Sequence, residues 1–213
     1  MIYRHFFWDF DGTLYDTYPR ITRACQRALG DFCVETAYDT VYAAAKRSLN
    51  YCGVAIGGPR GVSAEAFMEA YHRHAEEEGA ESIRPYSGVP EMLRAVVRNG
   101  GKNYLYTHRS TTALKWLRHD RLDALFADAV TKEDGFPSKP APDALNYLIE
   151  KHRLDRAQCV MLGDRDIDLD AGKNAGIACA LFDPENFYPS YDTPWRFQDM
   201  KTLQKALLEE GKA

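Results

Sequence analysis

The sequence predicts an α/β fold: a Rossmann-like core in which helices cover both faces of a parallel sheet, with a small α-helical insert. Two observations carry this prediction. From Pro85 onward, short apolar stretches alternate with stretches of helical periodicity, which is typical of repeated strand–helix–strand units. Before them, about seventy residues keep a helical period throughout. The helical insert therefore interrupts the core directly after its first strand.

The first strand is expected within residues 2–10, which are rich in Ile, Tyr, Phe and Trp. Asp9 and Asp11 close this stretch, and because side chains alternate along a strand, both point to the same side. Gly12 then allows the chain to turn sharply. Two carboxylates this close are unfavourable unless a cation lies between them or one is protonated. The pair therefore predicts a hard metal ion, Mg²⁺, bound through oxygen ligands.

The insert contains three amphipathic stretches with apolar residues at helical spacing, at 21–29, 38–49 and 67–75. Ser63 precedes the third and is its candidate N-cap. The segment 52–61 holds four glycines and Pro59, so it is expected to be a loop. Together these features predict a small helical bundle.

The remaining core elements follow in alternation. We expect helices at 90–98, 111–119, 142–151 and 168–175, and strands at 102–107, 127–131, 159–162 and 177–182. In open parallel sheets, ligands bind beyond the carboxyl ends of the strands. Asp9, Thr107 and Asp164 each stand at the end of an expected strand, so we expect them to lie together at that edge.

Composition narrows the possible functions. A chain of 213 residues can bury roughly 70% of its unfolded surface and needs no disulfide to fold. The formal net charge of −4 argues against a nucleic-acid partner. Five cysteines, odd in number and without CxxC spacing, indicate free thiols in a reducing cytosol. No apolar run approaches the roughly 18 residues of a membrane span. We therefore expect a cytoplasmic protein, while the oligomeric state stays open.

Four motifs carry a family resemblance: Asp9-Phe-Asp-Gly-Thr-Leu14, Thr107 at a strand end, Lys139 within Ser138-Lys-Pro-Ala-Pro142, and Gly163-Asp-Arg-Asp-Ile-Asp168. In this order they resemble the haloacid dehalogenase superfamily. The helical insert is similar to the cap of its phosphoglycolate phosphatase and β-phosphoglucomutase branch. The resemblance implies a catalytic core at 1–15 and 84–213 and a cap at 16–83.

The resemblance also implies roles for four aspartates. Asp9 would be the nucleophile that forms an aspartyl phosphate. Asp11 would act as general acid and then general base. The metal ligands would be Asp9, Asp11 through its backbone carbonyl, and Asp164. Asp168 would either bind the metal through water or orient Lys139.

The phosphoryl group would be bound by Gly12, Thr107, His108 and Lys139, and Thr107 and Lys139 would take part in catalysis. His108 and Arg165 depart from the family pattern, in which Asn and Ser are frequent at these positions. For His108, a contact with substrate or cap and a structural role both remain open.

The resemblance implies a Mg²⁺-dependent phosphatase acting on a small phosphomonoester, with phosphoglycolate as a candidate and sugar phosphates and nucleotides also open. Within the cap, the candidates for contacting the leaving group are Tyr15, Tyr18, Arg20, Lys46, Arg47 and the expected loop 52–61. The alternatives are another activity of the superfamily, such as a phosphomutase or a dehalogenase, and a non-catalytic phosphate-binding module. Asp11 and Asp164 argue against a dehalogenase, which needs neither Mg²⁺ nor a second acid. A receiver-type signalling domain would lack the helical insert.

Overall fold

The computed structural model describes residues 2–77 and 83–209. The chain divides into two compact units, one formed by Met1–Tyr15 with Pro85–Ala213 and the other by Asp16–Arg84. The boundary expected from the sequence after residue 83 lies one residue from this division. Each unit is described by itself.

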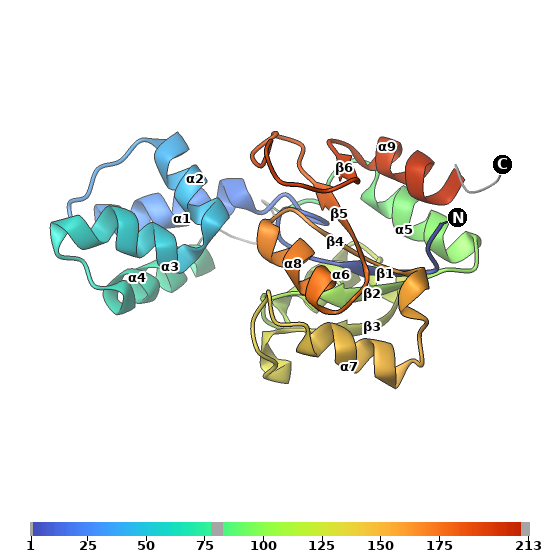
Figure 1. The fold of residues 1–213 in the computed structure, drawn as a ribbon. Coiled ribbons are helices and arrows are strands. Elements are labelled where there is room, and N and C mark those ends of the chain that lie inside the picture. The colour runs from blue at the N-terminus through green and yellow to red at the C-terminus, as the bar shows by residue number, and fades with distance from the viewer. Residues whose placement is uncertain (1, 78–82, 210–213) are drawn as a thin grey trace. The chain divides into compact units, whose positions relative to one another are not determined.

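The first unit contains a parallel sheet, which has six strands in the described part of the chain (Figure 1). These are β1 (His5–Trp8), β2 (Lys102–Tyr106), β3 (Phe126–Val130), β4 (Cys159–Gly163), β5 (Ala178–Phe182) and β6 (Arg196–Phe197), in the order β3-β2-β1-β4-β5-β6. Trp8, the last residue of β1, is level with Leu105 of β2 and Leu162 of β4. The segments that follow these three strands therefore leave the sheet side by side.

Helices cover both faces of this sheet: α5 (Val89–Arg98), α6 (Thr112–His119), α7 (Asp143–Lys151), α8 (Asp166–Asn174) and α9 (Met200–Gln204). On one face, Phe7 lies in a buried cluster with Leu145 and Leu148 of α7. Trp8 points the other way, and its Nε1 donates a hydrogen bond to Asn103 Oδ1 at 2.9 Å. The Asn103 amide in turn donates to the α5 carbonyl oxygen of Leu93, at 3.1 Å.

This arrangement confirms the predicted Rossmann-like core. The expected strands are all present, although β1 is shorter than the stretch 2–10 that suggested it. Strand β6 and helix α9 were not expected, because two and five residues are too few to establish a period. Among the described residues, no helix is both long and apolar enough to cross a membrane.

The second unit contains α1 (Tyr18–Gly30), α2 (Tyr38–Arg47), α3 (Leu49–Cys52) and α4 (Ala64–Glu77), and α1 packs against both α2 and α4. Its core includes the fully buried Leu29, Val41 and Phe67. Ser63 caps α4 as expected, since its Oγ accepts a hydrogen bond from the N–H of Ala66 at 3.1 Å.

The prediction of a loop at 52–61 was wrong. After α3 the chain continues through a π-helical turn at Gly53–Gly57 and a 3-10 turn at Gly58–Arg60. A Cβ at Gly53 would lie 2.6 Å from Cδ1 of Phe67. Gly53 is therefore needed for close helix packing, and only Gly61, with a φ of 81°, stops the helical path.

Candidate active site

Asp9 lies at the carboxyl end of the central strand. Its backbone N–H donates to the carbonyl oxygen of Leu162 at 2.9 Å, which extends the pairing of β1 with β4. Its side chain is buried. Gly12 then takes a φ of 80° and donates its N–H to Tyr15 at 2.8 Å. This tight turn, which favours glycine, brings the chain back over the sheet edge.

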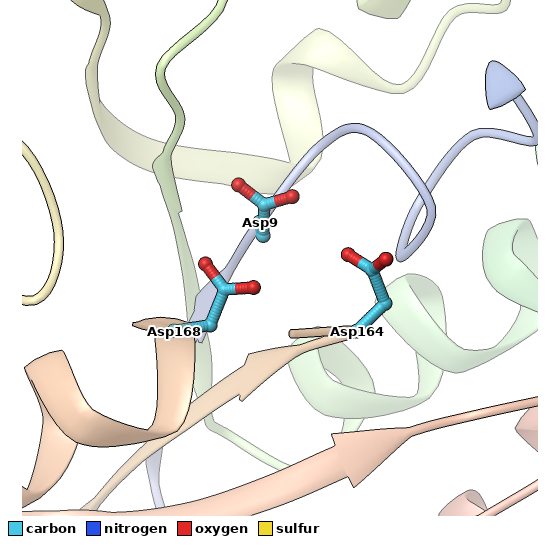
Figure 2. A group of neighbouring side chains, drawn as sticks. All are labelled: Asp9, Asp164 and Asp168. Atoms are coloured by element: carbon cyan, nitrogen blue, oxygen red, sulfur yellow. The ribbon is translucent and has the colours of Figure 1, made fainter. Parts of the chain in front are cut away.

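Three carboxylates meet at this edge, from Asp9, from Asp164 directly after β4, and from Asp168 in the first turn of α8. Figure 2 shows the three side chains turned toward a common space, and one oxygen of each lies within 4.8 Å of the others. All three residues are buried. Gly163 permits this approach, since a Cβ there would lie only 2.2 Å from the Cβ of Asp168.

Lys139 places one buried ammonium among these carboxylates. Its Nζ lies 2.6 Å from Asp9 Oδ1 and 2.8 Å from Asp168 Oδ1, and it donates to the carbonyl oxygen of Tyr106 at 2.9 Å. Asp9, Lys139 and Asp168, which the sequence could relate only through a family resemblance, are therefore in direct contact.

The protonation states follow from burial and from this contact. Burial raises the pKa of Asp9 to about 6, against the opposing effect of Lys139. For Lys139, burial opposes the charged form, but Asp168 and Asp9 outweigh it and raise the pKa of the ammonium above its usual value. For Asp168, burial is likewise outweighed, here by Lys139 and Arg165, so its pKa is lowered. The lysine is charged at neutral pH, and Asp168 is its ionised partner.

The carboxylate cluster fits a hard divalent cation. Three buried carboxylates near the Lys139 ammonium and the Arg165 guanidinium still leave an excess of negative charge, which is unfavourable in a buried site. The donors are oxygens only, the type that Mg²⁺ prefers. Thr13 helps to orient the set, since its hydroxyl donates to Asp164 Oδ1 at 3.4 Å.

Thr107 and His108 follow β2 beside this cluster. Thr107 is buried, and its N–H donates to the carbonyl oxygen of Val130 at 3.0 Å. The Nε2 atom of His108 accepts a hydrogen bond from the backbone N–H of Lys139 at 2.8 Å. Burial, together with the charges of Lys139 and Arg165, lowers the pKa of His108 to about 4. His108 is therefore neutral at pH 7 and holds the Lys139 segment in place.

Asp11 lies outside the three-carboxylate cluster. Its side chain, 25% exposed, accepts from Arg109: Nε lies 3.0 Å from both Oδ1 and Oδ2, and Nη2 lies 2.5 Å from Oδ1. The guanidinium also lies over the ring of Phe10, 5.5 Å from its centroid. Arg109 was not among the residues expected from the sequence. Its position two residues after Thr107 could have indicated that it lies near the site. Its contact with Asp11, 98 residues earlier in the chain, could not be predicted in this way.

The remaining candidates are divided between the two units. In the first, the N–H of Arg165 donates to Asp168 Oδ2 at 3.1 Å and so caps α8, and the hydroxyl of Tyr15 donates to Asp120 Oδ2 at 2.7 Å. In the second, the Nζ of Lys46 lies over the ring of Tyr18, 5.1 Å from its centroid. Arg20 contacts the carbonyl of Ala75, and Arg47 lies over the Tyr51 ring.

The chain is similar in sequence to known proteins. The model of the family described as haloacid dehalogenase-like hydrolase matches residues 6–182. A phosphoglycolate phosphatase of Vibrio vulnificus is 30% identical over 190 residues, covering 82% of this chain and 80% of that protein. The pyrophosphatase PpaX of Halalkalibacterium halodurans is 26% identical over 144 residues, covering 65% of this chain and 67% of that protein.

Solved structures show the same fold. A hydrolase from Streptococcus pneumoniae is 32% identical, with a TM-score of 0.65 over 85% of this chain and 94% of that one. A protein from Haemophilus somnus described as a predicted phosphoglycolate phosphatase is 21% identical, with a TM-score of 0.81 over 97% and 98% of the two chains. At that identity the second likeness concerns the fold alone.

Proposed function

Because the chain belongs to the haloacid dehalogenase-like hydrolase family, we propose that it is a Mg²⁺-dependent phosphatase that hydrolyses a small phosphomonoester through an aspartyl phosphate. The observation that carries this proposal is the contact of Lys139 with Asp9 and Asp168 beside Asp164. Such a set offers a nucleophile, a cation for the phosphoryl oxygens and a place for a metal ion within one buried cluster.

Asp9 is the proposed nucleophile. One of its carboxylate oxygens bonds to phosphorus while the bond from phosphorus to the leaving oxygen breaks. Repulsion between carboxylate and phosphate amounts to about 4 kcal/mol per charge pair at about 4 Å with an effective dielectric of about 20. Lys139 reduces this repulsion because its ammonium already lies 2.6 Å from Asp9 Oδ1. A bound Mg²⁺, held by Asp9, Asp164 and the Asp11 carbonyl, would supply further charge neutralisation.

Asp11 is the proposed acid and base. It lies two residues beyond Asp9, outside the buried cluster, and is partly exposed. The first step requires Asp11 in its protonated form, and its proton goes to the leaving oxygen. In the second step it takes a proton from the water that attacks phosphorus, the bond to Asp9 breaks, and inorganic phosphate leaves. Thr107, at the end of β2, is the proposed hydrogen-bond donor to a phosphoryl oxygen, together with backbone N–H groups such as that of Gly12.

The substrate proposed first is phosphoglycolate, because a relative of 30% identity bears the name phosphoglycolate phosphatase. Pyrophosphate is the second, from the relatives named pyrophosphatase. We propose that the unit Asp16–Arg84 is the cap that selects the leaving group, as the family resemblance implies.

The test is a panel of small phosphorylated metabolites with Mg²⁺, repeated with EDTA and with the Asp9→Asn variant. We expect phosphate release that EDTA abolishes and that Asp9→Asn lowers by about 10³-fold or more. Asp166→Asn is the matched control, since Asp166 is exposed at the start of α8 and lies outside the carboxylate cluster. Undiminished hydrolysis by Asp9→Asn would exclude Asp9 as the nucleophile, and no hydrolysis of any compound would favour a phosphate-binding module.

A further inference from the structure

We infer that Arg109 is a specificity-determining residue that binds a second anionic group, a carboxylate or a second phosphate, on the leaving part of the substrate. This inference rests on the proposed function and narrows its substrate class. It begins from the paired contact of Arg109 with Asp11, in which both carboxylate oxygens accept from one guanidinium.

The contact places Arg109 where the leaving group must bind. Asp11 has to reach the leaving oxygen in order to deliver its proton, yet both of its oxygens face Arg109. Binding of a productive substrate therefore requires the guanidinium to move away from at least one oxygen of Asp11. The space that Arg109 borders is consequently the space of the leaving group, beside the residue that protonates it.

The chemistry of guanidinium determines what can take the place of Asp11. Arg109 is only 15% exposed, so its charge is partly removed from water. When a partly buried cation leaves one carboxylate, another anion offsets the desolvation best. The planar fork of N–H donors fits carboxylate and phosphate groups in a bidentate manner, whereas a neutral leaving group offers no such partner.

Arg109 is anchored for this role independently of Lys139. Its backbone N–H donates to Thr107 Oγ1 at 3.0 Å, and its guanidinium lies over the Phe10 ring. Lys139 is engaged by Asp9 and Asp168 inside the buried cluster. Lys139 and Arg109 therefore hold separate positions, the first among the carboxylates of the reacting centre and the second beside Asp11.

The experiment measures hydrolysis of three substrates by the wild-type chain and by Arg109→Gln. Phosphoglycolate and pyrophosphate have an anionic leaving part, whereas glycolamide phosphate has a neutral one. The measured quantity is the ratio of kcat/KM for each anionic substrate to that for the amide. We expect Arg109→Gln to lower this ratio by about tenfold, the size of a coupling of about 1.4 kcal/mol. A fall for only one of the two anionic substrates identifies whether a carboxylate or a phosphate is bound.

Two controls separate recognition from damage to the site. Arg118→Gln, at an exposed position on α6, should leave the ratio unchanged. Arg109→Lys keeps the charge but loses the fork, so its ratio should lie between those of wild type and Arg109→Gln. If the glutamine variant does not fold, the ratio of Arg109→Lys should still be lower than that of wild type. An unchanged ratio in both Arg109 variants, with hydrolysis retained, overturns the inference and leaves the proposed function standing. Absence of hydrolysis by the wild type would overturn both.

Discussion

The imidazole of His108 accepts a hydrogen bond from the backbone N–H of Lys139, with 2.8 Å between Nε2 and the amide nitrogen. The bond joins the segment after β2 to the segment before α7, which are far apart in the sequence. It holds the backbone of the lysine whose ammonium lies between Asp9 and Asp168. His108 is therefore linked to the carboxylate cluster through the backbone of Lys139.

A first prediction concerns this acceptor. His108→Ala removes the acceptor of the Lys139 N–H, which should lower the stability of the fold by about 1–3 kcal/mol. The position of the lysine is then less well fixed. We expect kcat/KM to fall by about tenfold or more, because small displacements of catalytic groups are expensive. His108→Gln, which carries an acceptor at a similar reach, should retain most activity. Equal losses in both variants would show that the ring itself, and not its acceptor atom, is what matters.

The same histidine predicts a pH effect on stability. Burial, followed by the charges of Lys139 and Arg165, lowers the pKa of His108 from 6.5 to about 4. Between these values the unfolded chain binds more protons than the folded one, so this contribution is complete above about pH 6.5 and is lost as the pH falls toward about 4. Urea unfolding at several pH values should show the stability of wild type falling relative to that of His108→Gln as the pH falls.

The control for this pH effect is His72→Gln, since His72 is exposed on α4. Its difference from wild type should vary less with pH than that of His108→Gln. A stability difference for His108→Gln that stays constant from pH 7.5 to pH 4 would contradict the prediction.

The sequence predicts best where a single segment carries the information. The apolar stretch before Asp9 and those before Thr107 and Asp164 marked β1, β2 and β4, and the order of these strands in the sheet then brings the motif residues to one edge. Contacts between distant segments were harder to predict from the sequence. The pairing of Arg109 with Asp11 and that of His108 with the Lys139 backbone leave no local pattern, because each joins segments that are far apart in the sequence.

The glycines of 52–61 show why the role of a glycine is hard to predict from a sequence. The glycines of 52–61 were interpreted as loop residues, yet Gly53 and Gly57 lie in a helical turn against Phe67 and Val62. A glycine that allows a neighbouring side chain to pack closely cannot be distinguished in a sequence from a glycine that allows a turn. Only the neighbouring side chain, contributed from elsewhere in the chain, distinguishes them.

Gly163 provides a third prediction. An added Cβ would lie 2.2 Å from the Cβ and 2.6 Å from Oδ2 of Asp168, so Gly163→Ala must push α8 away from β4. Overpacking of this kind costs about 1–3 kcal/mol, and here it also displaces Asp164 and Asp168. We expect lower thermal stability together with a large loss of activity.

The matched substitution is Gly30→Ala. Gly30 ends α1 and a Cβ there meets no atom within 4 Å, so alanine should be neutral or slightly stabilising. A Gly163→Ala variant with the activity and stability of wild type would mean that α8 does not approach β4 as closely as this structure has it.

The fourth prediction separates metal binding from turnover. A ligand that binds only the folded state raises its stability by RT ln(1 + [L]/Kd), so Mg²⁺ should raise the melting temperature of the wild-type chain without any substrate. Asp164→Asn removes one of three buried carboxylates and with it part of the negative charge that favours a cation. We expect this variant to need a higher Mg²⁺ concentration for the same shift in melting temperature and for half-maximal hydrolysis. The exposed Asp166→Asn should behave as wild type.

Because removing a buried charge also relieves repulsion, the melting temperature of Asp164→Asn should be no lower than that of wild type when EDTA is present. If both variants gained the same stabilisation from Mg²⁺ as the wild type, the cation would have to bind elsewhere, and the excess charge of the carboxylate cluster would require another partner.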